Sequence, residues 1–178
     1  MDLILLSGES INNKFWIEEV EKNLRGLFEH TQILYYDHWS NGQPSINLDL
    51  EVTKLPGLVG GLGAYIIFAK SIGSVLSLRG IHEKTLTPKK CFFVGPAFLV
   101  GERNIPGFKS WLQNFAIPSI ILTKTSDPVA PAEEIRELLQ KYNVQNYEFV
   151  EIPGDSHKYE DLGKIQNLMN QLRYGTEA

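Results

Sequence analysis

The sequence has a single cysteine, Cys91, which excludes an internal disulfide and any cysteine-rich metal site. Cys91 lies in the apolar run 91–94, which is typical of a buried strand and favours an inert core thiol over a reactive one. The chain also lacks an excess of basic residues, since 21 acidic residues against 17 lysines and arginines give a net charge of −4. This charge provides no attraction for nucleic acid or for an anionic membrane surface. The partners left by this balance are small molecules and other proteins.

Long hydrophobic runs are missing as well. No segment approaches the roughly eighteen apolar residues of a membrane-spanning helix. The apolar residues 3–6 are few and follow the acidic Asp2, whereas a secretory signal has a basic start and a longer apolar stretch. We therefore expect a cytoplasmic protein without membrane insertion. With 178 residues, of which 43% are hydrophobic, residues 1–178 are expected to form one domain around one core.

Short apolar runs bounded by turn residues alternate with stretches whose apolar residues lie on one helical face. Most of the runs are continuously apolar, as strands covered on both faces must be. The sequence therefore predicts a central, mostly parallel sheet with helices on both sides. The candidate strands are residues 3–6, 32–36, 64–69, 91–94, 119–123 and 147–152.

Three amphipathic helices are well marked, and a fourth is ambiguous. The three apolar stripes are Trp16, Val20, Leu24 and Leu27; Ile135, Leu138, Leu139 and Tyr142; and Leu162, Ile165, Met169 and Leu172. The region 46–63 fits both a strand and a helix, and we choose a helix because a crossover between parallel strands is needed there. Pro56 is expected to end or kink this helix.

The segment around Ser71 has the pattern of a nucleophile elbow. An apolar strand runs directly into Ser71, and a helical pattern begins at once after it. Such a sharp turn requires small residues two positions before and two positions after the serine, and Ala69 and Gly73 fulfil this. The turn would expose the serine hydroxyl and aim the backbone N–H of Ile72 at an oxyanion. The competing interpretation is that Ser71 merely caps the helix.

A candidate acid and a candidate base come after two later strands in the sequence, each in the loop that follows its strand. Asp127 leaves the strand 119–123, and His157 lies between the last strand and the last helix. Because the carboxyl ends of parallel strands meet at one edge of the sheet, Ser71, Asp127 and His157 are expected to converge there as a catalytic triad. Asp155 is a competing acid, but it is ranked lower because it shares a tight loop with His157. Taken singly, Asp127 could begin a turn and His157 could be a solvated loop residue.

The order of Ser71, Asp127 and His157 resembles that of the α/β-hydrolase superfamily. The chain is similar to small lidless members of that superfamily, such as retinoblastoma-binding-protein-9-like serine hydrolases and dienelactone-hydrolase-like esterases. The resemblance covers nearly the whole chain and implies a three-layer α/β/α fold with six strands in the order 2-1-3-4-5-6. The sequence departs from the superfamily pattern in having Ala69 in place of the elbow's first glycine and in lacking the first two strands.

The resemblance implies a serine hydrolase that cleaves carboxylic esters or thioesters through an acyl-enzyme and needs no cofactor or metal. It also implies an oxyanion loop after the first strand, with backbone N–H groups of Gly8 and Glu9 joining that of Ile72. That loop lacks the His-Gly pair common in the superfamily.

Two further regions are candidates for substrate binding. Phe98 and Leu99 follow the fourth strand and would either line an open acyl pocket or join the core. His38 leaves the second strand on the same edge of the sheet, although packing is the more common role for such a residue. It lacks the spaced partners that a metal site needs.

Two other classes of function remain open. The first is a non-catalytic interaction module that retains the hydrolase fold. The second is a flavodoxin-like or Rossmann nucleotide binder, which ranks last because the loop 7–10 is poor in glycine and contains Glu9. The glycine-rich segment 57–63 precedes a strand instead of following one, so it does not fit a phosphate loop either.

Overall fold

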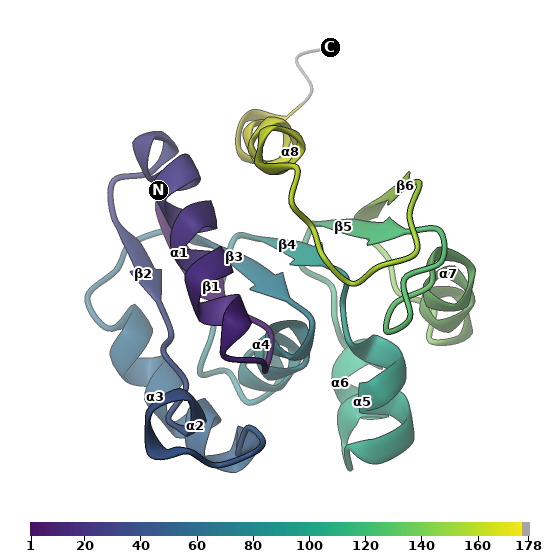
Figure 1. Cartoon of the computed structure of the whole chain (residues 1–178), viewed down its shortest axis with the longest axis horizontal. Helices are drawn as coiled ribbons and strands as arrows, with labels where there is room; N and C mark the ends of the chain where they lie inside the picture. The colour runs from purple at the N-terminus through teal and green to yellow at the C-terminus, as the bar shows by residue number, and fades with distance from the viewer. Residues whose placement is uncertain (176–178) are drawn as a thin grey trace.

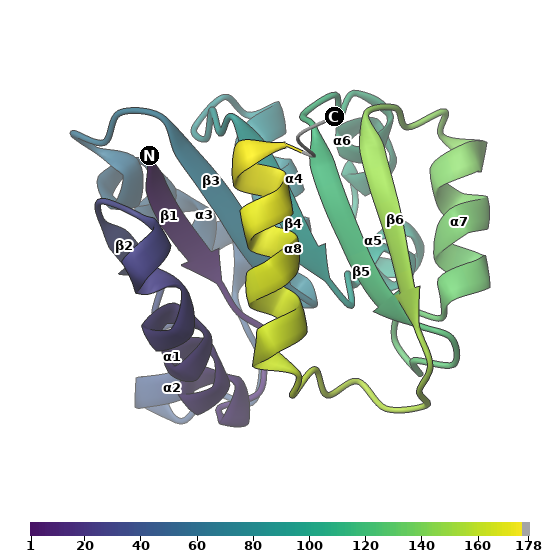
Figure 2. The ribbon, with the colours of Figure 1, turned by 90° about the horizontal axis from the view of Figure 1, so that it is seen from above.

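The computed structural model describes residues 1–175 and contains one six-stranded parallel sheet. Its strand order is β2-β1-β3-β4-β5-β6, which confirms the predicted order. All strands point toward the same edge of the sheet (Figure 2). The strands are β1 Asp2–Leu6, β2 Thr31–Ile33, β3 Tyr65–Lys70, β4 Lys90–Val94, β5 Ser119–Lys124 and β6 Tyr147–Ile152.

Helices cover both faces of the sheet and give the predicted three layers (Figure 1). Helices α1 and α8 lie on one face, and α3 to α7 lie on the other. The helices are α1 Asn12–Leu24, α2 His38–Asn41, α3 Leu48–Val59, α4 Ile72–His82, α5 Phe98–Asn104, α6 Phe108–Gln113, α7 Ala132–Lys141 and α8 Leu162–Tyr174, with a 3₁₀ turn at Arg25–Leu27.

The continuous apolar pattern of the strands follows from this layering. In β1, Leu3 and Leu5 pack into the core beneath α1 and α8, whereas Ile4 and Leu6 pack into the core on the other face. All four side chains are fully buried. A strand covered on both faces needs apolar residues at successive positions, because neighbouring side chains point to opposite faces.

The structure differs from the sequence prediction at two places near the β2 edge. Strand β2 ends at Ile33 and not at Tyr36, because it pairs only with β1, which ends at Leu6. Pro56 is expected to end or kink its helix, and the first alternative is wrong, since α3 continues to Val59. Proline removes one backbone N–H and with it one helical hydrogen bond. Because Pro56 lies close to the end of α3, no more than one further turn follows it.

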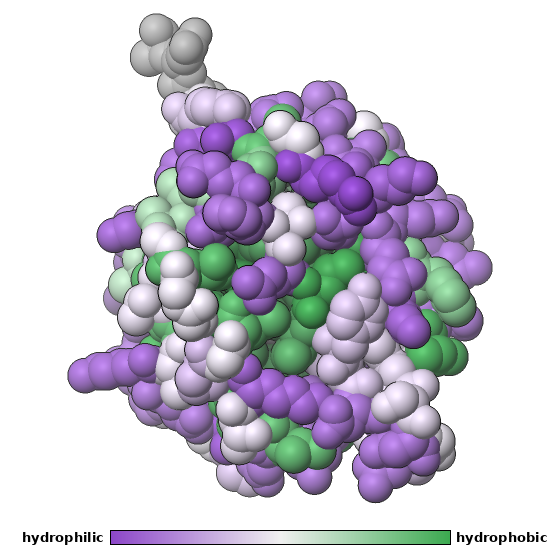
Figure 3. All heavy atoms as spheres, turned by 90° about the vertical axis from the view of Figure 1, so that its left-hand side faces the viewer, coloured by the Kyte–Doolittle hydropathy of each residue, from purple (hydrophilic) through white to green (hydrophobic). Residues whose placement is uncertain are grey.

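The face beside β2 shows apolar atoms in its middle, surrounded by hydrophilic residues (Figure 3). Strand β2 lies at the edge of the sheet and pairs only with β1.

Among residues 1–175, no helix is both long enough and apolar enough to cross a membrane.

The beginning of α4 is pressed against the end of β1 at Gly73. A Cβ atom added to Gly73 would lie 2.7 Å from the carbonyl oxygen of Ser7 and would also overlap that of Leu6. These are backbone atoms at the end of the buried strand β1 and just after it, so they cannot move aside as a flexible side chain could. The small residue that the sequence placed two positions after Ser71 is therefore required by close backbone packing.

We predict that Gly73→Ala lowers the free energy of unfolding by about 3 kcal/mol, because the methyl group overpacks a backbone contact. Urea denaturation would measure the loss. The matched control is Gly57→Ala, since Gly57 lies inside α3 with open space around it. There alanine should raise stability by up to about 1 kcal/mol through helix propensity. Equal effects of the two substitutions would contradict the packing argument.

Candidate active site

Ser71 lies between β3 and α4 in a strained backbone conformation. Its φ of 51° and ψ of −120° fall in a region that residues with side chains rarely occupy. Its backbone N–H donates to the carbonyl of Val94 at 3.1 Å, and its carbonyl accepts the N–H groups of Ser74 and Ala97 at 3.0 and 3.2 Å. These bonds fix the turn to the end of β4. The structure thus gives Ser71 the sharp strand-to-helix turn expected of a nucleophile elbow.

Asp127 lies behind β5 and is fully buried, with several hydrogen-bond donors around its carboxylate. Oδ1 accepts the backbone N–H groups of Val129 and Ala130 at 2.8 and 3.0 Å, and Oδ2 accepts the hydroxyl of Tyr159 at 2.7 Å. Burial by itself raises the pKa of Asp127, but the hydrogen bonds from His157, Tyr159 and Val129 outweigh it and lower the pKa to about 2. The acid is therefore an anion at neutral pH.

His157 pairs with this anion through its Nδ1 atom, which lies 2.9 Å from Oδ1 and 2.8 Å from Oδ2 of Asp127. An ionised carboxylate only accepts hydrogen bonds, so Nδ1 must carry a proton. In the neutral ring Nε2 is then a free base, and it is buried without a hydrogen-bond partner. Asp155, the competing acid, is exposed, whereas Asp127 makes the contact with Nδ1.

Gly95 connects the histidine to the elbow. A Cβ atom at Gly95 would lie 3.0 Å from Cε1 of His157, so the imidazole rests on the backbone just after Val94. Val94 in turn binds the N–H of Ser71. The structure thus brings Ser71, Asp127 and His157 to the same edge of the sheet. Nε2 of His157 has no hydrogen-bond partner, so Ser71 Oγ and His157 Nε2 are not hydrogen-bonded in this structure.

The proposed oxyanion loop lies beside the elbow, because Gly73 contacts the backbone of Ser7. The carbonyl of Ser7 accepts the hydroxyl of Tyr36 at 2.7 Å. Within residues 1–175, the backbone N–H of Ile72 begins a helix and has no intrahelical acceptor. The roles of Ile72, Gly8 and Glu9 as oxyanion donors stay predictions.

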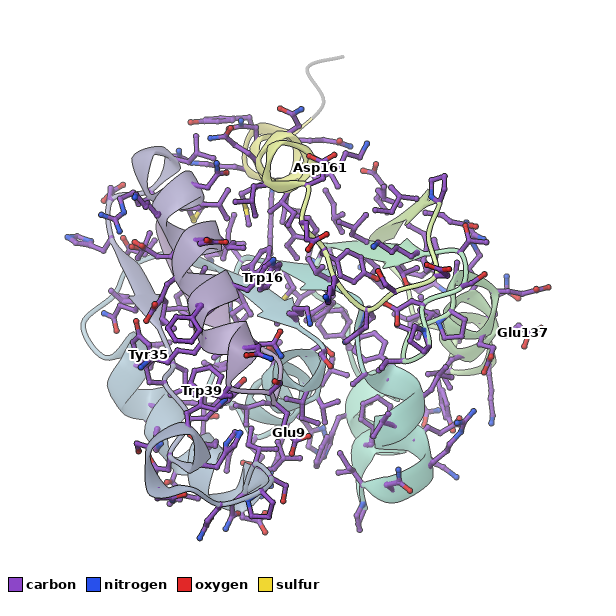
Figure 4. All side chains as sticks on the ribbon, viewed as in Figure 1. Glu9, Trp16, Tyr35, Trp39, Glu137 and Asp161 are labelled. Carbon is purple, nitrogen blue, oxygen red and sulfur yellow. The ribbon has the colours of Figure 1, made fainter. Side chains whose placement is uncertain are left out.

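His38 supports this loop. Its Nε2 and the indole Nε1 of Trp39 each lie 2.7 Å from the carbonyl oxygen of Glu9. His38 also contributes to the wall of a surface pocket of about 570 Å³, whose other residues include Ile11 and Pro44. Figure 4 shows Glu9 and Trp39 on this side of the molecule. His38 therefore lies next to a pocket, while its Nε2 atom holds the loop that contains Glu9.

The structure resolves the choice left open for Phe98. Its side chain is 1% exposed and packs edge-on against Phe93, with ring centroids 5.5 Å apart. A second ring, Phe108, lies at 6.0 Å. Phe98 thus belongs to the core and does not line an open pocket. Leu99 is buried in the same core cluster.

Lys70, the residue before Ser71, is a buried lysine that the sequence pattern did not single out. Its Nζ donates to Oδ1 of Asn13 at 3.1 Å and lies 5.5 Å from the ring centre of Trp16. The side chain of Asn13 packs against Gly8. Burial lowers the pKa of Lys70 to about 8, although the charge of Asp127 acts in the opposite direction. A lysine at the end of an otherwise apolar strand was the signal that could have revealed it.

Within residues 1–175, no group of three or more His, Cys, Asp or Glu side chains is arranged to hold a metal ion. The side chains that meet at this edge are instead a hydroxyl, an imidazole and a carboxylate. Such a set suits nucleophilic acyl transfer with proton relay.

Comparison with solved structures identifies the fold. An α/β serine hydrolase homologue from Coxiella burnetii has a TM-score of 0.74 and 19% identity, over 95% of this chain and 83% of that one. The monoacylglycerol lipase of Paleococcus ferrophilus has a TM-score of 0.66 and 14% identity, over 94% and 91%. A protein from Bacillus cereus ATCC 10987 has a TM-score of 0.73 and 15% identity over 97% of this chain, which spans only 60% of that protein.

The sequence matches no protein-family model and no curated protein. The structural similarities, together with the strand order, show that the chain has the α/β-hydrolase fold.

We predict that Lys70→Met raises the free energy of unfolding at pH 7 by about 2 kcal/mol. The folded protein releases the Lys70 proton near pH 8, whereas the unfolded chain holds it up to about pH 10.5. Since the unfolded state binds more protons between these values, wild-type stability gains with pH there. The advantage of the variant should therefore shrink from pH 8 toward pH 10.5.

Urea denaturation of both proteins at pH 7 and pH 9.5 would measure this difference. Lys22→Met is the matched control, because Lys22 is exposed on α1. A difference between Lys70→Met and wild type that stays constant with pH would show that folding does not lower the pKa of the Lys70 amine.

Proposed function

We propose that this protein is a serine hydrolase that cleaves carboxylic esters or thioesters through an acyl-enzyme, with Ser71, His157 and Asp127 as its catalytic triad. The observation that carries the proposal is the buried Asp127–His157 pair, whose free Nε2 lies at the same sheet edge as the strained Ser71. Strain and a strongly shifted pKa at one place mark a functional site more often than a structural one. The structural neighbours described as a lipase and a serine hydrolase homologue support the same class.

The reaction follows from the protonation states of the site. Nε2 of His157 accepts the proton of the Ser71 hydroxyl as its oxygen attacks the acyl carbonyl. Asp127 stabilises the imidazolium that results, because its carboxylate already holds Nδ1. The proton then passes from Nε2 to the departing alcohol or thiol. In the second half-reaction His157 takes a proton from water as the water oxygen attacks the acyl carbon. The bond from that carbon to Ser71 Oγ then breaks, Nε2 returns the proton to Oγ, and the carboxylic acid is released.

The oxyanion formed at each stage needs hydrogen-bond donors. The N–H of Ile72 at the start of α4 is one proposed donor, and those of Gly8 and Glu9 are the others. The loop that carries Gly8 and Glu9 is held by three contacts, from Tyr36 to Ser7 and from His38 and Trp39 to Glu9. A loop held in this way is pre-organised, which is the property an oxyanion site requires.

A second candidate function is a non-catalytic interaction module with the hydrolase fold. One observation favours it, namely the absence of a hydrogen bond between Ser71 and His157 Nε2. Apo hydrolases often have loose contacts between nucleophile and base, so this geometry fits both functions. An experiment on the reactivity of Ser71 separates them.

We predict that a fluorophosphonate labels Ser71 and that the label is lost in Ser71→Ala and His157→Ala. The base is required because an isolated serine hydroxyl is a weak nucleophile. Mass spectrometry of the digested protein would locate the adduct. Hydrolysis of p-nitrophenyl acetate should fall by a factor of about 10⁴ in His157→Ala and in Asp127→Asn.

His30→Ala is the matched control, because His30 forms a similar pair with Asp2, 3.0 Å apart, near the opposite end of β1. This variant should label and turn over like the wild type. If folded wild-type protein neither labels nor hydrolyses the ester, the hydrolase proposal is wrong and the interaction module is favoured.

A further inference from the structure

The hydroxyl of Tyr159 is placed directly behind the acid–base pair. Tyr159 is 3% exposed, and its oxygen lies 2.7 Å from Oδ2 of Asp127. The same oxygen accepts the backbone N–H of Lys124 at 3.2 Å. That bond leaves the phenol proton to be donated, and Asp127 is its nearest acceptor. The alternative acceptor, Thr123 Oγ1, is 3.5 Å away and carries no negative charge.

Other elements fix the rest of Tyr159. Its carbonyl accepts the indole N–H of Trp16 at 2.7 Å, and Trp16 reaches from α1 toward the middle of the sheet (Figure 4). The ring packs against Gly95, where an added Cβ would lie 2.7 Å from Cε2. The amine of Lys124 lies 5.3 Å from the ring centre. Helix α1 and the ends of β4 and β5 therefore hold the phenol in place.

Tyr159 and His157 share one oxygen of Asp127. Oδ2 lies 2.8 Å from Nδ1 of His157 and 2.7 Å from the phenol oxygen. A carboxylate oxygen that accepts two hydrogen bonds holds each donor less strongly, because its negative charge is shared between them. We propose that Tyr159 is a positioning residue of the triad: it fixes Asp127 and weakens its hold on the imidazolium, so that His157 stays an unprotonated base at lower pH. This inference rests on the proposed hydrolase function.

Several charged groups lie around His157 and Tyr159 on neighbouring elements. Asp127 comes from the loop after β5, Lys70 from the end of β3 and Lys124 from the end of β5. Asp155 and Lys158 are exposed on the loop that carries His157. Of these charged groups, only Asp127 loses a hydrogen bond from its side chain when the phenol oxygen of Tyr159 is removed. A change in the proton affinity of His157 in Tyr159→Phe can therefore be assigned to the lost hydrogen bond.

We predict that Tyr159→Phe lowers kcat for p-nitrophenyl acetate roughly tenfold and changes KM less than about twofold. The acid limb of the pH profile of kcat/KM should move to higher pH by roughly half a unit, because Asp127 then holds the imidazolium more tightly. A role in folding alone would not move this limb. Thermal unfolding would verify that the variant is folded.

The matched control is Tyr142→Phe. Tyr142 donates to the carboxylate of Glu102 at 2.8 Å, which is the same type of contact between α7 and α5, away from the triad. Its loss should leave both kcat and the acid limb unchanged. A loss of kcat in Tyr159→Phe without a shift of the acid limb overturns the proposed charge sharing.

A second measurement does not depend on catalysis. Nuclear magnetic resonance of the imidazole ring, assigned with His157→Gln, gives the pH at which His157 takes up its proton. That pH should be higher in Tyr159→Phe than in wild type or Tyr142→Phe. If wild-type protein has no esterase activity, the proposed function fails, and this titration still decides whether Tyr159 weakens the Asp127–His157 contact. An unchanged titration overturns it.

Discussion

The buried charge of Asp127 is the constraint around which the carboxyl edge of the sheet is organised. An unpaired carboxylate in a protein interior would be very unfavourable, and it is tolerated only when each oxygen is supplied with donors. Here the donors are two backbone N–H groups of its own loop, the imidazole of His157 and the phenol of Tyr159. Satisfying one anion thus fixes the loop after β5 and the loop after β6 relative to each other.

The serine is held by a separate constraint. Ser71 keeps its strained conformation because β4 binds its N–H through Val94 and because Gly73 lets α4 start directly against β1. The Asp127–His157 pair and the turn at Ser71 are therefore built from different contacts, and His157 rests on Gly95 beside that turn. Lys70, the residue before Ser71, is a third feature of this edge. Its buried amine donates to Asn13, whose side chain packs against Gly8 in the proposed oxyanion loop. Its burial costs stability at neutral pH.

The sequence pattern predicted the sheet well, because parallel strands buried on both faces leave continuous apolar runs such as residues 3–6. It was less successful where tertiary contacts decide, as at β2, whose end depends on where its partner β1 stops. The order of Ser71, Asp127 and His157 was readable because loops after parallel strands share an edge. The contact between Tyr159 and Asp127 could not be predicted from the sequence. Nothing in a single irregular loop indicates that the residue two positions after His157 turns back to Asp127. Phe98 was ambiguous because an apolar residue after a strand suits a core and a pocket alike.

The distribution of unfavourable features bears on the choice between an enzyme and an interaction module. A serine at positive φ, a buried carboxylate, a buried lysine and an unpaired imidazole nitrogen all lie at one edge of the sheet. The strained serine and the buried lysine each lower stability, and a module that only presents a surface would gain nothing from either. An acyl-transfer site needs the strained turn to expose its hydroxyl, the buried anion to orient its base and an unpaired Nε2 to receive the proton. The unpaired Nε2 of His157 fits both functions, so the strained turn at Ser71, which a surface module does not need, is what favours a hydrolase.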